Sequence, residues 1–226
     1  MEAAASPNLK GYFDSTIGQT VVAAYKVNSE GQLIELSLDE YAREVEPQLD
    51  FSPLSEFSNS ALNNNTITPF AYNYKYYTFI PNGSSSTYYK SPVKVSNPVL
   101  CPSNATTDCP ITVGWTTTTT HEFSANVTLS TQEDAIQTAL GYTYSSSTSF
   151  AITYTLPIPK GRQGYVGFRP RVKTHYGKLN HYHQIGSNTK LLSSTSSSAT
   201  YPLKNSDGTT DGIFVVVDNS TGQIMN

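Results

Sequence analysis

Alternation of apolar and polar residues over unusually long stretches is the main feature of the sequence. From Val113 to Leu129 most odd positions are apolar or aromatic, and the even positions are mostly Thr, Ser and Asn. From Leu140 to Ile158 the even positions carry the apolar and aromatic residues, and the odd positions are nearly all Ser, Thr, Gly or Ala. A period of two predicts β-strands. At about 3.3 Å per residue these two stretches would each extend roughly 55 to 60 Å. The pattern therefore predicts an elongated, mostly β protein of long twisted antiparallel strands.

Shorter strands follow from the same alternation and from the turn residues between them. In chain order we expect a hairpin over 18–37, an aromatic strand over 67–80, the turn "PNGSSS" and a strand over 87–96, then strands over 166–176, 191–201 and 213–219. Arg169, Arg171 and Lys173 alternate along one face of the 166–176 strand. They either meet lipid phosphates or acids of a neighbouring subunit, or they form a solvated sheet face.

Two short helices complete the prediction. Ser37 and Glu40 have the spacing of a capping box, and Leu38, Tyr41 and Val45 fall on one face of a helix that Pro47 would end. A further helical turn is possible over 52–57. The stretch 130–139 begins with Ser130 and Glu133 at the same spacing, and it forms either a helix or a turn.

Composition indicates an extracellular protein. Only 14% of the residues are charged, Ser and Thr make up roughly a quarter of the chain, and there are 16 tyrosines. The formal net charge of -3 gives no broad attraction to nucleic acid or to anionic lipid. No run of 18 apolar residues is present, and the start of the chain has no apolar stretch of signal-peptide length, although a leader could have been removed.

Cys101 and Cys109 lie close together in "CPSNATTDC". We expect a small disulfide loop, and therefore an oxidising compartment and a secreted protein. The alternative is two reduced thiols. Two ligands without a nearby histidine do not favour a metal site.

The order "TTTTTHEFSANVTLS", a connector, "GYTYSSSTSFAITYTLPIPKG" and "GYVGFRPRVK" resembles the aerolysin-type family of β-pore-forming toxins, including its epsilon-toxin and mosquitocidal-toxin branch. The resemblance covers about residues 90–220. It implies an aerolysin-like long-strand module over 96–226, and a small α+β N-terminal head over 1–95 that could bind a receptor. It also implies a secreted protein that binds a cell-surface receptor or glycan, forms a homo-oligomeric ring and inserts a β-hairpin into a lipid membrane.

In this resemblance the connector between the two long strands is the membrane-inserting element. Its lipid-facing candidates are Phe123, Ala125, Val127, Leu129, Leu140, Tyr142 and Tyr144. The connector is short for the family, and Glu133 and Asp134 lie at its centre. The alternative is therefore a non-lytic glycan-binding or structural module that retains the aerolysin-like scaffold.

Tyrosines form the densest aromatic patch of the sequence. The candidates for a receptor- or glycan-binding surface are Tyr72, Tyr74, Tyr76, Tyr77, Tyr88 and Tyr89. A tyrosine offers an apolar ring and a hydroxyl group, which suits sugars and lipid headgroups. Ordinary cross-strand packing is the alternative. For the single tryptophan, Trp115, a core position is favoured over ligand contact.

Signals for enzyme chemistry are weak. Neither a nucleophile elbow nor a zinc-protease motif nor a phosphate-binding loop is present in the sequence. His181 and His183 share a strand face that His175 could approach, but surface histidines on a hairpin explain them equally well. The stretch "NSDGTTDG" is similar to a calcium loop, yet Asp-Gly pairs more often mark β-turns. We expect no catalysis, no metal and no cofactor.

Overall fold

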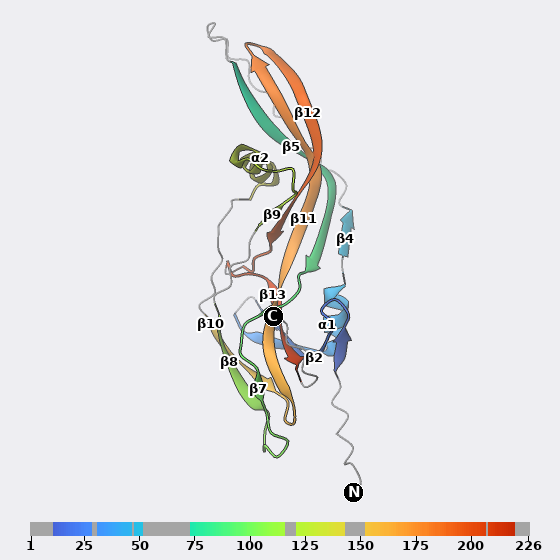
Figure 1. The fold of residues 1–226 in the computed structure, drawn as a ribbon, viewed down its shortest axis with the longest axis vertical. Helices are drawn as coiled ribbons and strands as arrows, with labels where there is room; N and C mark the ends of the chain where they lie inside the picture. Colours follow the sequence, from blue (N-terminus) through green and yellow to red (C-terminus); the bar gives the residue numbers. More distant parts are fainter. Residues whose placement is uncertain are drawn as a thin grey trace.

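A computed structural model describes residues 11–28, 31–46, 48–51, 73–115, 121–142, 152–206 and 208–219 (Figure 1). Strands make up 60% of these residues, and they form a curled half-barrel sheet with two short helices. The elements are β1 Tyr12–Asp14, β2 Gln19–Val27, β3 Leu33–Leu36, α1 Leu38–Val45, β4 Gln48–Phe51, β5 Asn73–Tyr89, β6 Val93–Lys94, β7 Val99–Leu100, β8 Cys109–Trp115, β9 Glu122–Phe123, α2 Ser130–Leu140, β10 Ile152–Ile158, β11 Gln163–Ile185, β12 Asn188–Pro202 and β13 Gly212–Asp218. The predicted mostly β fold with long antiparallel strands is confirmed.

Strand β11 runs nearly the length of the molecule. It has 23 residues, which corresponds to roughly 75 Å of extended chain. Its first part, Gly164–Pro170, pairs antiparallel with β13, and its second part, Val172–Ile185, lies between β5 and β12. The lower end of the molecule is thus a broad sheet, whereas the upper end is a long three-stranded ribbon (Figure 1).

Two layers cover the lower sheet. On one face, Tyr41 and Val45 of α1 pack against Val215 and Val217 of β13. On the other face lies a separate two-stranded sheet, β8 with β10. Its Ile111 and Leu156 form a second hydrophobic core with Phe168 of β11 and Phe214 of β13. The predicted disulfide joins Cys101 to Cys109 beside this sheet, with the two Cα atoms 5.4 Å apart.

Local sequence signals account for much of the lower part. Ser37 caps α1, and its hydroxyl accepts a hydrogen bond from the Glu40 backbone amide while the Glu40 carboxylate accepts one from the Ser37 amide. Strands β2 and β3 form the hairpin expected over 18–37. The tail forms the buried strand β13 after a turn in which Gly208 has a φ of 84°. These three predictions are confirmed.

The hairpin predicted at "PNGSSS" is wrong. Strand β5 continues through this stretch, and the register opposite β11 passes from Pro81↔Gly177 to Ser85↔His175. Two extra residues of β5 are therefore accommodated as a bulge. Gly83 has a φ of 81°, and the side chain of Asn82 accepts hydrogen bonds from the amide and the hydroxyl of Ser84. The turn chemistry is present, but β11 provides a continuous partner on both sides of it, so the chain does not reverse.

The single strand predicted over Val113–Leu129 is also wrong. Strand β8 ends at Trp115, residues 116–120 lie outside the described residues, and the chain then pairs with β12 for only two residues in β9. A turn follows, in which the Val127 amide bonds to the Ser124 carbonyl at 2.9 Å. Of the strand predicted over Leu140–Ile158, only the part in β10 is a strand among the described residues. Leu140 instead ends α2.

Candidate functional site

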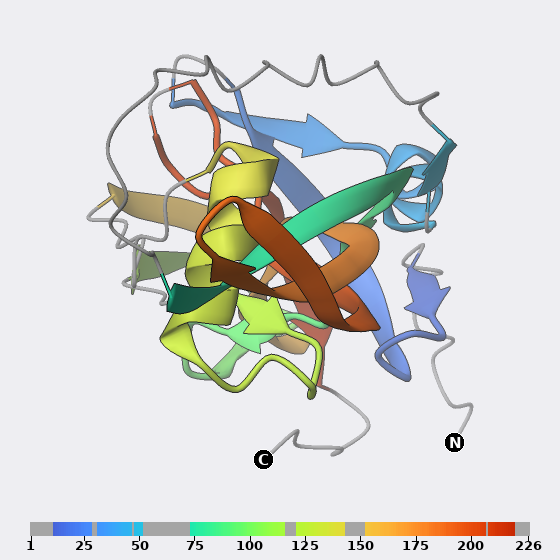
Figure 2. The same ribbon diagram turned by 90° about the horizontal axis from the view of Figure 1, so that it is seen from above.

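Residues 121–142 form a small unit on the upper sheet, which comprises β9, a turn and α2. We call it the α2 unit. Ile136 of α2 is fully buried against Phe79 of β5, Leu179 of β11 and Ala199 of β12. The two helices lie on different sides of β11 when the molecule is seen along its long axis (Figure 2). Of the two alternatives for 130–139, the structure has the helix rather than the turn, and a small apolar cluster attaches it to the ribbon.

The start of α2 differs by one residue from the predicted cap. Leu129 occupies the N-cap position, and Ser130 is the first helical residue. The side chain of Gln132 accepts hydrogen bonds from the amides of Thr128 and Leu129 at 2.8 and 3.0 Å. Gly141 caps the C-terminus of the helix, and its φ of 67° is the left-handed conformation that glycine favours.

The lipid-facing candidates are spread over the α2 unit. Phe123, Val127 and Leu140 pack partly buried against the Ile136 cluster. Ala125 and Leu129 are exposed, in the turn and at the N-cap respectively. Tyr144 lies outside the described residues.

A stack of four rings holds the two ends of the α2 unit against the ribbon. His121 stacks on Tyr142 with ring centroids 5.3 Å apart, Tyr142 on Tyr201 at 4.4 Å, and Tyr201 on His175 at 5.8 Å. Burial lowers the pKa of His121, and the charge of Lys204 lowers it further. Burial also lowers the pKa of His175, together with the charge of Lys173. Burial therefore favours the neutral form of both end rings. The sequence gives no signal for this stack, because its members come from four separate segments.

Backbone and side-chain hydrogen bonds add to this attachment. The Ser124 amide donates to the Ser198 carbonyl at 3.0 Å, and the Ser198 amide donates to the Ser124 hydroxyl at 3.0 Å. The side chain of Asn126 donates to the Ser197 hydroxyl at 2.7 Å. The carboxylate of Glu122 also pairs with Lys90. Only the two residues of β9 pair with β12, so among the described residues the α2 unit is held by fewer backbone bonds than a strand in the middle of a sheet.

The structure divides the tyrosine patch. Tyr74, Tyr76 and Tyr77 lie at the upper end of β5, where Tyr76 stacks on Tyr182 and Tyr77 stacks on His181. Tyr89 is buried at the other end of the strand, and its hydroxyl donates to Glu44 at 2.9 Å. Tyr88, on the opposite face from Tyr89, lies across from Val172. Tyr72 lies outside the described residues.

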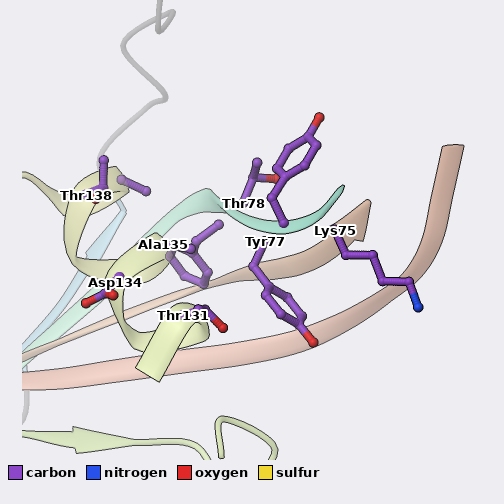
Figure 3. A pocket seen from close by; sticks show the side chains of 10 residues that line it. Lys75, Tyr77, Thr78, Thr131, Asp134, Ala135 and Thr138 are labelled. Carbon is purple, nitrogen blue, oxygen red and sulfur yellow. The ribbon is translucent and has the colours of Figure 1, made fainter. Parts of the chain in front are cut away.

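A groove of about 460 Å³ is lined by residues of both β5 and α2 (Figure 3). Tyr77 of β5 lines one side of the groove, and the helix contributes Thr131, Asp134 and Thr138 to the lining. An aromatic face opposite hydroxyl and carboxylate oxygens is a suitable surface for a sugar ring. The wall formed by α2 was not expected from the sequence, because the helix and β5 are far apart in the chain.

The expectation of a solvated or ligand-binding basic row is wrong for Arg169. This side chain is 1% exposed and pairs with Asp14, which is also 1% exposed. It donates to the Tyr41 hydroxyl at 2.7 Å and to the Lys90 carbonyl at 3.0 Å. Burial alone would raise the pKa of Asp14, but hydrogen bonds from Thr16 and Tyr41 and the charge of Arg169 lower it. This network connects the N-terminal elements to β11. Arg171, the next member of the row, pairs with Asp211.

The three histidines considered for zinc each have a different neighbour. His175 lies 3.1 Å from the Tyr201 hydroxyl, His183 lies 2.6 Å from the Asn73 side chain, and His181 stacks on Tyr77. Across the described ranges, no group of three or more His, Cys, Asp or Glu side chains could hold a metal ion. In "NSDGTTDG" the Gly208 amide bonds to the Asn205 carbonyl at 3.0 Å, as expected for a turn. None of the helices in the described part combines the length and apolar character needed to cross a membrane.

A family model matches residues 73–226, which begin at the first residue of β5 and include the whole α2 unit. The chain belongs to the DUF6060 family. DUF6060 is described as a family of unknown function. Neither a curated protein nor a solved structure matches the chain. The DUF6060 region contains β11 and Arg169, whereas the partners Asp14 and Tyr41 precede it.

Proposed function

We propose that this DUF6060 member is a secreted, cell-surface-binding protein of the β-pore-forming type, related to the aerolysin-type toxins. It oligomerises, and the connector between β8 and β10 leaves the ribbon and inserts into a membrane as a β-hairpin. In the folded form the described part of this connector is the α2 unit.

The register between β8 and β10 carries the proposal. Trp115 lies opposite Ile152, and Val113 lies opposite Tyr154. If the same one-to-one pairing continues beyond Trp115, Phe123 meets Tyr144, Ala125 meets Tyr142, and Val127 meets Leu140. Residues directly opposite each other in an antiparallel pair project from the same face. Six of the seven lipid-facing candidates thus become three cross-strand pairs on one face, without any shift of register.

The opposite face of this extended hairpin is polar. Continuing the pairing places Thr118 opposite Ser149, Thr120 opposite Ser147, and Ser124 opposite Thr143. Hydroxyl groups cost less to remove from water than charges do, and they also suit a water-filled lumen. The apolar stretch Phe123–Leu129 extends about 20 Å, most of the roughly 25 Å apolar band of a membrane barrel.

Forming the hairpin requires α2 to unwind and the Ile136 cluster to separate. Both attachments are small. The cluster has four buried members with partly buried apolar residues packed around them. The other described contacts include the ring stack, the bonds to β12 and the ion pair between Glu122 and Lys90. A membrane that accepts the apolar face could offset their loss.

Dye release from vesicles tests the proposal. Ala125→Asp leaves an exposed turn residue exposed in the folded form, but it places a carboxylate on the lipid-facing side of the hairpin. Such a charge costs up to about 2 kcal/mol at mid-membrane. We expect release, and SDS-resistant oligomers, to be lost in Ala125→Asp and retained in Thr128→Asp, its control on the polar face. Absence of release by the unmodified protein from every vesicle and cell tested would contradict the proposal.

The groove between β5 and α2 favours a second candidate function, a non-lytic glycan-binding module. In that case Tyr77→Ala abolishes binding to a glycan array, and the unmodified protein binds sugars without lysing cells. Tyr88→Ala, a tyrosine far along the same strand, is the matched control. Lysis together with glycan binding that is unchanged in Tyr77→Ala would exclude this alternative.

A further inference from the structure

We infer that the distal tip of the ribbon is a docking surface for a lipid bilayer with anionic headgroups. The tip comprises residues 73–80 of β5, 178–185 of β11, the connecting 186–187 and 188–195 of β12. This inference deepens the proposed function, because it assigns initial attachment to the tip, separately from the α2 unit that inserts. Docking and insertion can therefore be measured independently.

Large apolar side chains are concentrated at the tip without being buried. Ile185 is 52% exposed, Leu191 49%, Leu192 41% and Tyr74 51%. They come from three different strands, at the end of the molecule that is farthest from the lower sheet (Figure 1). An apolar cluster at the extremity of an elongated protein can enter a flat surface without obstruction by the rest of the fold.

A bulge contributes to this arrangement. His181 pairs with Ser193 and Tyr182 pairs with Leu191, so Leu192 is the extra residue of β12. Bulges change the direction in which side chains project, and they commonly mark functional positions at sheet edges. Two adjacent leucines at a bulge are poorly placed for a core but well placed for contact with a partner.

The charge of the tip identifies the partner. These described stretches contain Lys75, Lys178 and Lys190 and neither Asp nor Glu, although the whole chain has a formal net charge of -3. A lysine close to an anionic membrane contributes about 1 kcal/mol of attraction. A protein partner would need acidic residues at positions that match these lysines. A membrane that contains phosphatidylserine instead presents negative charge over its whole surface.

The tyrosines of the tip are of the type found at membrane interfaces. Tyr76 stacks on Tyr182 at 5.4 Å, and Tyr74 lies 5.7 Å from Tyr76. Tyrosine is enriched where hydrocarbon meets headgroups, because its ring is apolar and its hydroxyl remains hydrated. Apolar, aromatic and cationic side chains are thus present together at the tip, and all three types are favoured at the surface of an anionic bilayer.

Flotation with vesicles tests the inference. We expect the unmodified protein to bind phosphatidylcholine vesicles that contain phosphatidylserine, and to bind pure phosphatidylcholine more weakly. Leu191→Asn/Leu192→Asn should weaken binding at least about tenfold, since two leucines lose their transfer from water. The matched control, Ile34→Asn/Leu100→Asn, changes two apolar residues that are at least as exposed and lie far from the tip, and it should bind normally.

Lysine variants separate charge from apolar contact. Lys190→Gln should weaken binding to the anionic vesicles about fivefold and leave binding to phosphatidylcholine unchanged, whereas Lys160→Gln at the lower end should have no effect. Equal binding by the tip variant and its control, or binding only to glycans without lipid, would overturn the inference. Adsorption without dye release would leave the inference intact and contradict the proposed function. Dye release that is unchanged in the tip variants would contradict the inference and leave the proposed function intact.

Discussion

Tyr142 stacks on Tyr201 with their ring centroids 4.4 Å apart, and this contact joins the end of the α2 unit to the β12 strand. His121, at the start of the same unit, covers the other face of Tyr142. One stack therefore holds both ends of a 22-residue unit, 121–142, that the proposed function requires to be released.

Acid should weaken this stack. Burial lowers the pKa of His121 and His175 below the ordinary value of 6.5, so between the folded and unfolded pKa values the unfolded chain binds more protons. Stability should therefore fall as the pH decreases below about 6.5. Thermal unfolding at pH 7.5 and pH 5.0 measures the decrease. His121→Phe/His175→Phe keeps the rings without the titration and should show a smaller decrease; an unchanged decrease would contradict this explanation.

The buried pair of Arg169 and Asp14 should dominate the attachment of the N-terminal elements. Removing one partner of a buried ion pair leaves an uncompensated charge and typically costs about 3 to 5 kcal/mol. We expect Asp14→Asn to lower the free energy of unfolding in urea by about that amount. Lys26→Gln, which removes the half-exposed pair with Glu44, should cost less than about 1 kcal/mol.

The pair of Arg169 and Asp14 should lose its contribution to stability only at acidic pH. The pKa of Asp14 is lowered in the folded protein, so its contribution to stability is present above about pH 4 and is lost as the pH falls through the folded value. Asp14→Asn should remove this component of acid unfolding. Equal stability of Asp14→Asn and Lys26→Gln at neutral pH would show that the pair does not have the assigned role.

Gln132 should control how easily α2 unwinds. Its side chain satisfies the Thr128 and Leu129 amides at the helix start, and loss of such a cap costs about 1 kcal/mol. We expect Gln132→Ala to release dye from vesicles several-fold faster than the unmodified protein. Thr138→Ala, which changes an exposed residue of the same helix, should not accelerate release. Slower release in Gln132→Ala would contradict a role for unwinding.

Local sequence signals predicted the elements that depend on neighbours in the chain. The capping box of Ser37 and Glu40 located α1, alternation located the middle of β11, and the apolar run "IFVVV" after a turn located β13. The "PNGSSS" stretch has equally strong turn chemistry, but it forms a bulge because a long partner strand lies beside it. Turn signals therefore predict a reversal only where pairing does not compete.

The candidate site could be predicted only in part, because its contacts are long-range. The alternation of Phe123, Val127 and Leu140 marked them as one apolar face. That His121 and His175 cap one stack, and that Asp14 lies next to Arg169, depends on pairs that are far apart in the chain. Periodicity and residue spacing do not predict such pairs, because the contacts follow only from the topology of the sheet.

A cross-link between the α2 unit and β12 should prevent activity. Ser124 and Ser198 are paired through backbone hydrogen bonding, and paired residues in antiparallel strands lie within the Cα range of disulfides. Oxidised Ser124→Cys/Ser198→Cys should release no dye, and a reducing agent should restore release. The unmodified protein treated with the same reductant is the control for Cys101 and Cys109. Release at the normal rate from fully oxidised protein would show that the α2 unit need not move.

The cysteine pair Thr128→Cys/Ala139→Cys tests the central claim most directly. Thr128 precedes α2 and Ala139 lies in its last turn, so in the folded form they are separated by roughly 15 Å along the helix. In the hairpin that continues the β8–β10 register they lie directly opposite each other. The account predicts that this pair forms a disulfide only after vesicles are added. In the control Asn126→Cys/Ala139→Cys the first cysteine is two residues out of register, so little disulfide should form. No vesicle-dependent cross-link in the first pair, or equal cross-linking in both, would contradict it.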